Sequence, residues 1–283
     1  MLIGNKTFIE CLNDFTKLEV FMNLDYIKSF FRLLGINPKR LYYSLKGLTV
    51  YLNNLVSYKR KQRLGEKFSI QLKSIFPVYS DRYMEAGNAK GHYFHQDLWA
   101  ARKIFGNSPE NHVDIGSRVD GFIAHLLVFR DITVVDVRVL ETNVKGLNYV
   151  QGDITCLDFD SNSLESISCL HAIEHIGLGR YGDEIDLDGW MKGLKEMQRV
   201  LQPGGKLFLG VPIGVERLCF DAHRVFSPST IKEALDELEV TDFSFVNDEG
   251  DFVKSNVELK DVPRMDYGCG LFEFIKPVNT SRN

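Results

Sequence analysis

The spacing of apolar residues changes near residue 111, and this change divides the chain into two parts. Between about residues 7 and 58, apolar positions recur every three or four residues, which is typical of amphipathic helices. Beyond residue 111, short β-branched runs alternate with helical patterns. Such alternation favours a mostly parallel sheet with helices on both faces. We therefore predict an α/β protein with an N-terminal helical accessory segment (1–75), a connecting or lid region (76–110) and a domain built on a mostly parallel sheet (111–283).

Individual runs predict the elements of this domain. Strands are expected at 113–115, 131–138, 147–153, 164–170, 206–212, 240–246 and 271–275. Helices are expected at 122–129, at 189–201 and from Ser227 and Pro228 onward, where a serine cap precedes proline. A shorter helix is predicted at 98–105. The residues before it, 91–97, are interpreted either as a lid over a ligand or as a loop in which Asp97 caps that helix.

The first strand of the domain ends at a glycine turn that leads into a helix. Gly116 and Gly121 permit backbone conformations, or a close ligand approach, that a side chain would prevent. A strand, a glycine turn and a helix N-terminus together form a cradle for a nucleotide-like ligand. Taken alone, this unit fits any ligand of that kind.

The N-terminal segment is rich in aromatic residues and carries no recognisable chemistry. We expect it to pack on the main domain, on a partner or on a membrane surface. The basic run 59–63 is interpreted as a solvated helix face or linker, with contact to phosphates or anionic lipid as the alternative.

Composition narrows the functional class. The net charge of −4 argues against a general nucleic-acid binder, because such proteins usually carry a basic face. The 5 cysteines include no C-x-x-C pair, which favours a reduced protein without a structural zinc site. No apolar run approaches the roughly 20 residues that cross a bilayer, and the first residues lack the order of a secretion signal. We therefore expect a cytoplasmic location.

Five motifs occur in a characteristic order along the second part of the chain. They are Asp114-Ile115-Gly116-Ser117, Asp136 at a strand end, Gly152-Asp153-Ile154, Ile173-Glu174-His175, and Leu201-Gln202-Pro203-Gly204-Gly205. In this series they resemble the class I S-adenosylmethionine-dependent methyltransferases, and the resemblance covers roughly residues 90–280. Further motifs, such as Tyr181-Gly182-Asp183 and Ala222-His223-Arg224, are similar to an uncharacterised branch often found among surface-polysaccharide genes.

The resemblance implies a Rossmann-like methyltransferase fold and S-adenosyl-L-methionine as the cofactor. In such proteins the loop after the first strand passes under the methionine part, Asp136 matches the acid that binds the ribose, and Asp153 matches the acid near the adenine. The implied cofactor-binding residues are Asp114, Gly116, Ser117, Gly121, Asp136, Asp153, Ile154 and His171. A carboxylate at a strand end can accept hydrogen bonds from both ribose hydroxyls.

The glycine turn departs from the family pattern at Arg118, which occupies a position where many relatives have glycine. The arginine either obstructs the usual cofactor approach or points away and pairs with Asp120. This departure is what favours the alternative function given below.

Candidate catalytic residues follow the fourth strand, where acceptor chemistry is placed in similar proteins. His175 is the first candidate for a general base and His171 the second, because histidine titrates near neutrality. Glu174 and His223 complete the catalytic set, although Glu174 and His175 alternatively only brace a helix. Arg180, Tyr181 and Arg224 are candidates for substrate binding; the alternative for Arg224 is a salt bridge to Asp221 or Glu216. We expect no metal, since Glu174 and the three histidines lack the spacing of known ligand sets.

These observations predict an S-adenosylmethionine-dependent methyltransferase that O-methylates a carbohydrate or other small acceptor, as a monomer or homo-oligomer. The carbohydrate part comes only from the resemblance. The alternative is a non-catalytic protein that keeps the fold as a scaffold or partner-binding module. A nicotinamide-dependent oxidoreductase ranks lower, because it predicts a G-x-G-x-x-G turn that the sequence lacks.

Overall fold

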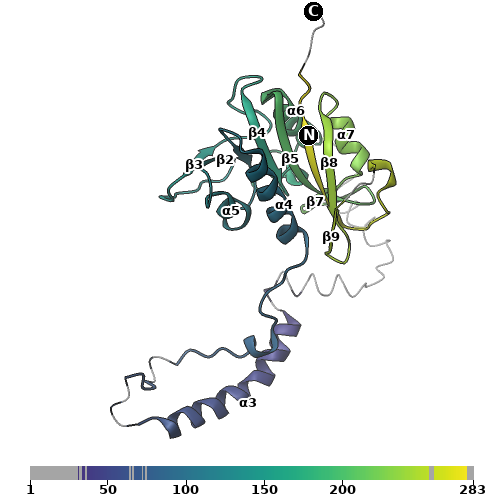
Figure 1. The fold of residues 1–283 in the computed structure, drawn as a ribbon. Coiled ribbons are helices and arrows are strands. Elements are labelled where there is room, and N and C mark those ends of the chain that lie inside the picture. Colours follow the sequence, from purple (N-terminus) through teal and green to yellow (C-terminus); the bar gives the residue numbers. More distant parts are fainter. Residues whose placement is uncertain are drawn as a thin grey trace, which may run out of the picture. The chain divides into compact units, whose positions relative to one another are not determined.

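The computed structural model of the chain describes residues 31, 34–35, 37–63, 65, 67–71, 73, 75–254 and 258–278. The chain divides into two compact units, Met1–Gly87 and Asn88–Asn283 (Figure 1). We describe each unit by itself. The division falls after Gly87, between the boundaries expected at 75 and 110, because the helix that follows it belongs to the second unit.

One long helix dominates the first unit. Helix α3 (Pro38–Lys61) begins with proline in its first turn, and the Asn37 side chain accepts a hydrogen bond from the Arg40 amide. The helical pattern predicted for this stretch is therefore confirmed, whereas the pattern before residue 31 lies outside the described residues. Tyr43 stacks on Tyr83 of the short 3₁₀ helix η2 (Asp81–Tyr83), so the returning chain covers one side of α3. Leucines on another side are exposed.

The second unit is built on an eight-stranded sheet with the order β3-β2-β1-β4-β5-β10-β8-β9. Its strands are β1 (Val113–Ile115), β2 (Ile132–Asp136), β3 (Leu147–Gln151), β4 (Leu164–Leu170), β5 (Leu201–Ile213), β8 (Glu239–Val246), β9 (Phe252–Lys254) and β10 (Gly268–Ile275). The first five strands are mutually parallel, and β10 runs antiparallel between β5 and β8. A separate hairpin joins β6 (Arg217–Cys219) to β7 (His223–Val225).

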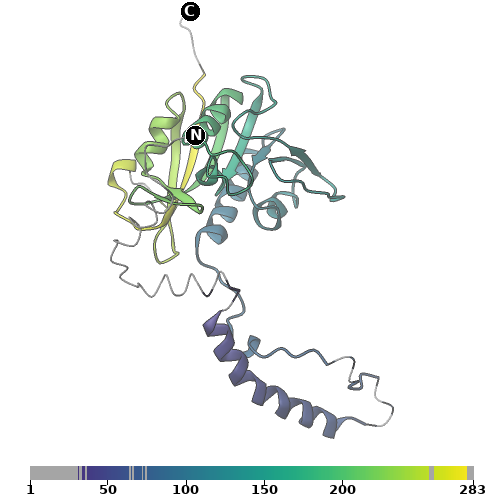
Figure 2. The same cartoon turned by 180° about the vertical axis from the view of Figure 1, so that it is seen from behind.

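Helices cover both faces of this sheet, as predicted (Figures 1 and 2). Alternation along the strands separates two cores: Cys169 and Leu209 face one side, while Leu170 and Phe208 face the other. The first side packs against α6 (Gly189–Val200) and α7 (Pro228–Ala234). The second packs against α4 (His92–Asn107) and a π-helical turn (Val119–Ile123) that continues into α5 (Ala124–Leu126). The chain thus has a Rossmann-like α/β fold.

Two element boundaries differ from the prediction. Helix α4 begins at His92 rather than at residue 98, so Asp97 lies inside the helix and does not cap it. Gly91 precedes the helix and has a φ of 90°. Its backbone amide donates a hydrogen bond to the Gly250 carbonyl, and these two features fix the start of the helix at His92. Strand β5 begins at Leu201 rather than at 206, and its pairing with β4 shifts register between Leu164 and Ser166.

No helix within the described ranges combines the length and apolar character required to cross a membrane. The longest of them, α3, carries basic residues in its last turn.

A buried histidine connects the beginning of β1 with β4. The two ring nitrogens of His112 lie 2.7 Å from the Ser166 hydroxyl and 2.9 Å from the Ser168 hydroxyl. Burial lowers the pKa of His112 to about 3, so the imidazole is neutral in the folded protein at pH 7.

This burial makes His112 a source of acid sensitivity. Below about pH 6.5, the pKa of His112 in the unfolded chain, the unfolded chain binds a proton at this residue. The folded protein does not bind that proton until the pH falls to about 3. Stability contributed by His112 is therefore present above pH 6.5 and is lost as the pH falls. We predict that the difference in unfolding free energy between wild type and His112→Asn shrinks by up to about 1.4 kcal/mol per pH unit below pH 6.5. Urea denaturation at pH 7.5, 6 and 5 measures this; a constant difference would contradict the buried neutral state.

Candidate functional site

The carboxyl ends of the parallel strands form a crevice, which is where ligands bind in open α/β sheets. One pocket there has a volume of about 50 Å³. Its lining is drawn from β1, β2 and the loops that follow β1, β2, β3 and β4, and includes Gly116, Asp136, Arg138, Ile154, His171, His175 and Tyr181. A neighbouring pocket of about 400 Å³ shares Val137, Ile176 and Tyr181 with it and also contains Asp153. Five predicted cofactor or catalytic residues thus meet at the first pocket.

The loop after β1 is held from below by a buried carboxylate. Asp114 accepts hydrogen bonds from the Ser117 amide (3.0 Å), the Ser117 hydroxyl (2.7 Å) and the Ser168 hydroxyl (2.6 Å). The Ser117 hydroxyl in turn accepts from the Leu170 amide. Burial raises the pKa of Asp114 to about 6, against the effect of these hydrogen bonds. Asp114 and Ser117 therefore support the loop through buried hydrogen bonds, and their contact with the cofactor stays a prediction.

The two glycines of the turn are close to neighbouring side chains. Gly116 has a φ of 74°, and a Cβ there would lie 2.8 Å from the Cβ of Ala172. A Cβ on Gly121 would lie 2.8 Å from Asp97 Oδ2. Only glycine lets the turn approach the loop after β4 at Gly116 without strain.

Arg118 points away from the pocket. Its guanidinium forms a salt bridge with Asp120 (2.8 Å) and lies over the ring of Tyr93, 5.4 Å from its centroid. The second of the two orientations expected for Arg118 is the one observed, and the arginine is not part of the lining of the small pocket.

A different arginine occupies the predicted ribose site. Asp136 accepts hydrogen bonds from the amide and the Nε of Arg138, each at 2.9 Å, and the Arg138 Nη2 binds its other oxygen. The Arg138 guanidinium also lies over the ring of Tyr181, 5.0 Å from its centroid. Both carboxylate oxygens that would receive ribose hydroxyls are therefore engaged. The motifs did not indicate Arg138, because they identify strand ends and not side-chain partners.

One ring nitrogen of His175, Nε2, has no hydrogen-bond partner among the described residues. The other, Nδ1, lies 2.6 Å from the Ala222 carbonyl oxygen and 3.2 Å from Arg180 Nη1; because a carbonyl only accepts, Nδ1 carries the proton and the lone pair is on Nε2. Burial lowers the pKa of His175 to about 4, so the ring is neutral at pH 7. Glu174 Oε1 lies 3.7 Å from that Nε2, and burial raises the pKa of Glu174 to about 8. Among the described residues, Glu174 Oε2 has no hydrogen-bond partner.

His171 lies at the centre of a group of aromatic side chains. Its backbone has a φ of 51°, and burial lowers its pKa well below the usual range. His92 Nδ1 lies 3.2 Å from His171 Nε2, and the rings of Tyr93 and His171 are 5.2 Å apart. Tyr267 packs between His92 and His223, 5.0 Å from each. The histidines at 171 and 223 thus face one cluster with His92 and Tyr267, which sequence analysis did not join to them.

The two candidate substrate arginines bind backbone oxygens. Arg180 donates to the Ala222 carbonyl at 2.8 Å, and Arg224 donates to the Ile176 carbonyl at 2.7 Å. Neither partner expected for Arg224 is used; Glu216 instead accepts from the Ser227 amide and the Thr230 hydroxyl. The arginines therefore brace the loop after β4, and a substrate role for them stays a prediction.

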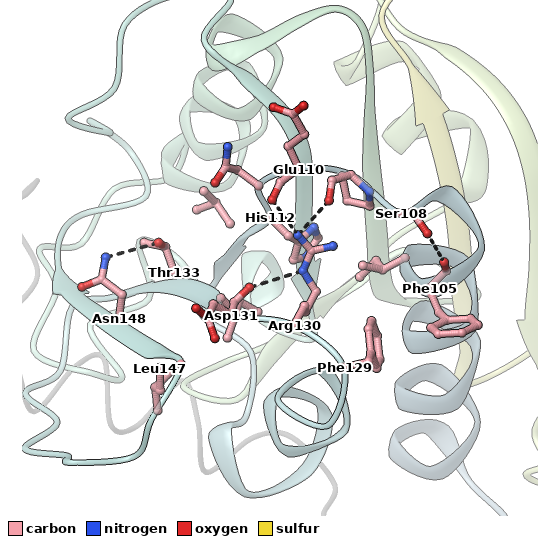
Figure 3. A pocket seen from close by; sticks show the side chains of 16 residues that line it. Phe105, Ser108, Glu110, His112, Phe129, Arg130, Asp131, Thr133, Leu147 and Asn148 are labelled. Carbon is pink, nitrogen blue, oxygen red and sulfur yellow. Dashed lines mark hydrogen bonds between the residues drawn. The ribbon is translucent and has the colours of Figure 1, made fainter.

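A larger cavity lies at the opposite edge of the sheet (Figure 3). It has a volume of about 690 Å³ and is lined by residues at the amino ends of β1, β2 and β3. Arg130 donates to the carbonyls of Pro109 and Glu110 there, so its guanidinium is already engaged. We assign the functional site to the smaller pocket, because the carboxyl edge is where this class of sheet binds ligands.

Comparisons with known proteins give one partial family match. A family model described as "Caenorhabditis protein of unknown function, DUF268" matches residues 154–259. A comparison with curated proteins finds no match.

Solved structures give likenesses at low sequence identity. The N-methyltransferase NodS from Bradyrhizobium japonicum, in complex with S-adenosylhomocysteine, is 16% identical with a TM-score of 0.45, over 66% of this chain and 89% of that chain. A putative methyltransferase from Bacillus halodurans is 16% identical with a TM-score of 0.45, over 63% of this chain and 99% of that chain. The [4+2]-cyclase SpnF is 12% identical with a TM-score of 0.46, over 67% of this chain and 88% of that chain.

The network under the loop makes Asp114 a stability determinant. Asp114→Asn replaces one carboxylate oxygen with an amide group that cannot accept from Ser117 and Ser168. We predict a loss of about 1–3 kcal/mol in unfolding free energy, the usual cost of leaving buried polar groups unpaired. Chemical denaturation at pH 7.5 measures this, with Asp120→Asn on the exposed side of the same turn as the matched control. Equal stability of the two variants would show that the network does not hold the loop.

Proposed function

We propose that this chain binds S-adenosylmethionine at the carboxyl edge of its sheet and transfers the methyl group to an oxygen of a small, carbohydrate-like acceptor. The observation that carries the proposal is the convergence of Gly116, Asp136, Ile154, His171 and His175 on one pocket. These residues come from four separate segments of the chain, and the motif order implied the same residues.

The pocket fits the cofactor only after a local opening. Ligand pockets usually have volumes of about 300–1,000 Å³, so a pocket of about 50 Å³ is too small by itself. Its neighbour of about 400 Å³ is separated from it at Tyr181, on which Arg138 stacks. Movement of these two side chains would join the pockets and release the Asp136 carboxylate for the ribose hydroxyls.

The charge of the crevice supports a cationic ligand. The cofactor supplies a methyl group on a positively charged sulfur, which acidic and aromatic neighbours favour. Burial lowers the pKa values of His171 and His175, so both rings are neutral at pH 7 and do not repel that charge. Asp153 adds negative charge at a neighbouring strand end, and Asp136 would add a second once Arg138 has left it.

His175 is suited to receive the proton of an acceptor hydroxyl. Its Nδ1–H is anchored on the Ala222 carbonyl, which orients the basic Nε2. As the acceptor oxygen formed its bond to the methyl carbon, the bond from that carbon to the cofactor sulfur would break, S-adenosylhomocysteine would leave, and the hydroxyl proton would pass to this nitrogen. Tyr93 and Tyr267, beside His171 and His92, offer flat apolar faces with a hydroxyl end. Such side chains suit an acceptor with both apolar and hydroxyl surfaces, such as a sugar.

A non-catalytic scaffold is the second candidate. The feature that favours it is no longer Arg118, which pairs with Asp120, but Arg138, which occupies the Asp136 carboxylate. The nicotinamide alternative is weaker, because the antiparallel β10 beside β5 departs from the dinucleotide-binding strand order.

Loss of the ribose partner should weaken cofactor binding. We predict that Asp136→Ala lowers the affinity for S-adenosylmethionine about tenfold to a hundredfold, as expected for hydrogen bonds to a charged group. Calorimetric titration measures this, with Asp131→Asn at the opposite edge of the sheet as the control. The cofactor proposal fails if wild type shows neither heat of binding nor thermal stabilisation. If Asp136→Ala binds the cofactor like wild type, Asp136 is not a cofactor-binding residue.

Loss of the proposed base should reduce turnover and spare cofactor binding. We predict that His175→Ala lowers methyl transfer about 10²- to 10⁴-fold, whereas His95→Ala, outside the pocket lining, does not. The wild-type rate should fall only as the pH drops through about 4, where His175 becomes protonated. Mass spectrometry for methyl gain across nucleotide sugars and glycans identifies the acceptor, and rates on it compare the variants. Full activity of His175→Ala would remove the base from the mechanism.

A further inference from the structure

Three side chains that are far apart in the sequence meet beside the cofactor pocket. One possible ligand atom from each of His92, His171 and Cys269 lies within 4.8 Å of the other two. They come from the first turn of α4, the residue after β4, and β10. We propose that these three side chains bind a divalent transition metal of the zinc type, with a fourth coordination position open to an oxygen ligand.

The distances are close to those of a coordinated metal. Zinc binds histidine nitrogen at about 2.0–2.1 Å, so two nitrogens on a tetrahedral ion lie about 3.3 Å apart. His92 Nδ1 and His171 Nε2 lie 3.2 Å apart. Cys269 Sγ lies 3.9 Å from the other ring nitrogen of His171, Nδ1, and the three possible ligand atoms lie within 4.8 Å of one another. A sulfur and a nitrogen on the same ion would be about 3.6 Å apart, so the thiol would need to move by up to about 1.2 Å to share the ion with His171 Nε2.

The surroundings orient the histidine at the edge of the cluster. His92 Nε2 lies 3.2 Å from the Tyr267 carbonyl oxygen and donates its proton to it. This bond places the lone pair on Nδ1, the nitrogen that faces His171. A backbone carbonyl on the other ring nitrogen is the usual support of a metal-binding histidine.

Further contacts fix the position of both partners. The Gly91 amide donates to the Gly250 carbonyl at 2.8 Å, which anchors the start of α4 to the turn after β8. Asp248 in the same turn accepts from the amides of Asp266 and Tyr267. The turn therefore holds His92 and the segment before Cys269 in place together.

The donor set indicates the class of metal. Two imidazoles and a thiolate suit zinc or cobalt, whereas magnesium and calcium prefer oxygen ligands. Three protein ligands with an open fourth position are typical of catalytic rather than structural zinc. Because His171 also lines the small pocket, the open position would lie beside the proposed methyl-transfer site. Metal binding itself does not depend on the proposed function.

The prediction of no metal was based on Glu174 and the histidines at 171, 175 and 223, which are near one another in sequence or motif. His92 and Cys269 lie 79 and 98 residues from His171, and only the fold brings the three together.

Cobalt binding tests the proposal directly. The full chain, freed of metal by a chelator, is titrated with Co²⁺ and followed by absorption. We expect one Co²⁺ per chain, with visible bands of a tetrahedral site and a thiolate-to-cobalt charge-transfer band. Addition of Zn²⁺ should abolish both. Cys269→Ser should lose the charge-transfer band, and His92→Asn should weaken binding by at least about tenfold, since even outer-shell changes cost that much.

Matched variants identify the ligands. Cys219→Ser and His95→Asn change the same residue types outside the cluster and should bind Co²⁺ like wild type. Absence of cobalt binding in wild type, or unchanged spectra in Cys269→Ser and His92→Asn, would overturn the metal site and leave a hydrogen-bonded His–His–Cys chain. If Cys269→Ser does not fold, His92→Asn alone decides: cobalt affinity and a spectrum like those of wild type would overturn the site, and weakened binding would support it. Titration with S-adenosylmethionine is scored separately, so failure of either proposal is distinguishable from failure of the other.

Discussion

The site depends on a buried chain of hydrogen bonds between β1 and β4. It runs from His112 through the Ser168 hydroxyl to Asp114, and from Asp114 through Ser117 to the Leu170 amide. Every member is satisfied, which a polar network in a low-dielectric interior requires. The network fixes the position of the loop after β1 relative to the end of β4. Residues at both places, Gly116 and His171, line the small pocket.

A second constraint acts from the turn after β8. Through Asp248 and Gly250 it positions the loop before β10 and the start of α4. This turn thereby places three side chains near His171: His92, Tyr267 and Cys269. In the sheet, the strand of Cys269 and the strand of Asp136 lie on opposite sides of β4. The carboxyl edge consequently has two regions: strand ends with carboxylates, and a cluster of neutral histidines with tyrosines. This division suits a reaction with a cationic donor on one side and a hydroxyl acceptor on the other.

The elements that were predictable are those that local patterns specify. A β-branched run identified β2, and the Ser227-Pro228 pair identified the start of α7, because capping is a local effect. The start of α4 was missed because it depends on Gly91 binding Gly250, a contact between distant segments.

The same distinction holds for the site. Motif order predicted Gly116, Asp136, His171 and His175, which the pocket brings together. It could not predict that Arg138 binds Asp136, or that Ser117 faces inward, since both depend on side-chain partners rather than on strand ends. The roles of Glu174 and the two arginines depend likewise on burial and on backbone oxygens contributed by other loops.

The central claim is that the carboxyl edge, closed here by Arg138 and Tyr181, is the cofactor site. The most direct measurement is a crystal structure of the protein with S-adenosylhomocysteine. The account predicts that the ligand lies over the Gly116 turn, that its ribose binds Asp136, and that Arg138 has left that carboxylate. A ligand in the cavity around Arg130 at the opposite edge, or an Arg138–Asp136 pair that persists beneath the bound ligand, would contradict it.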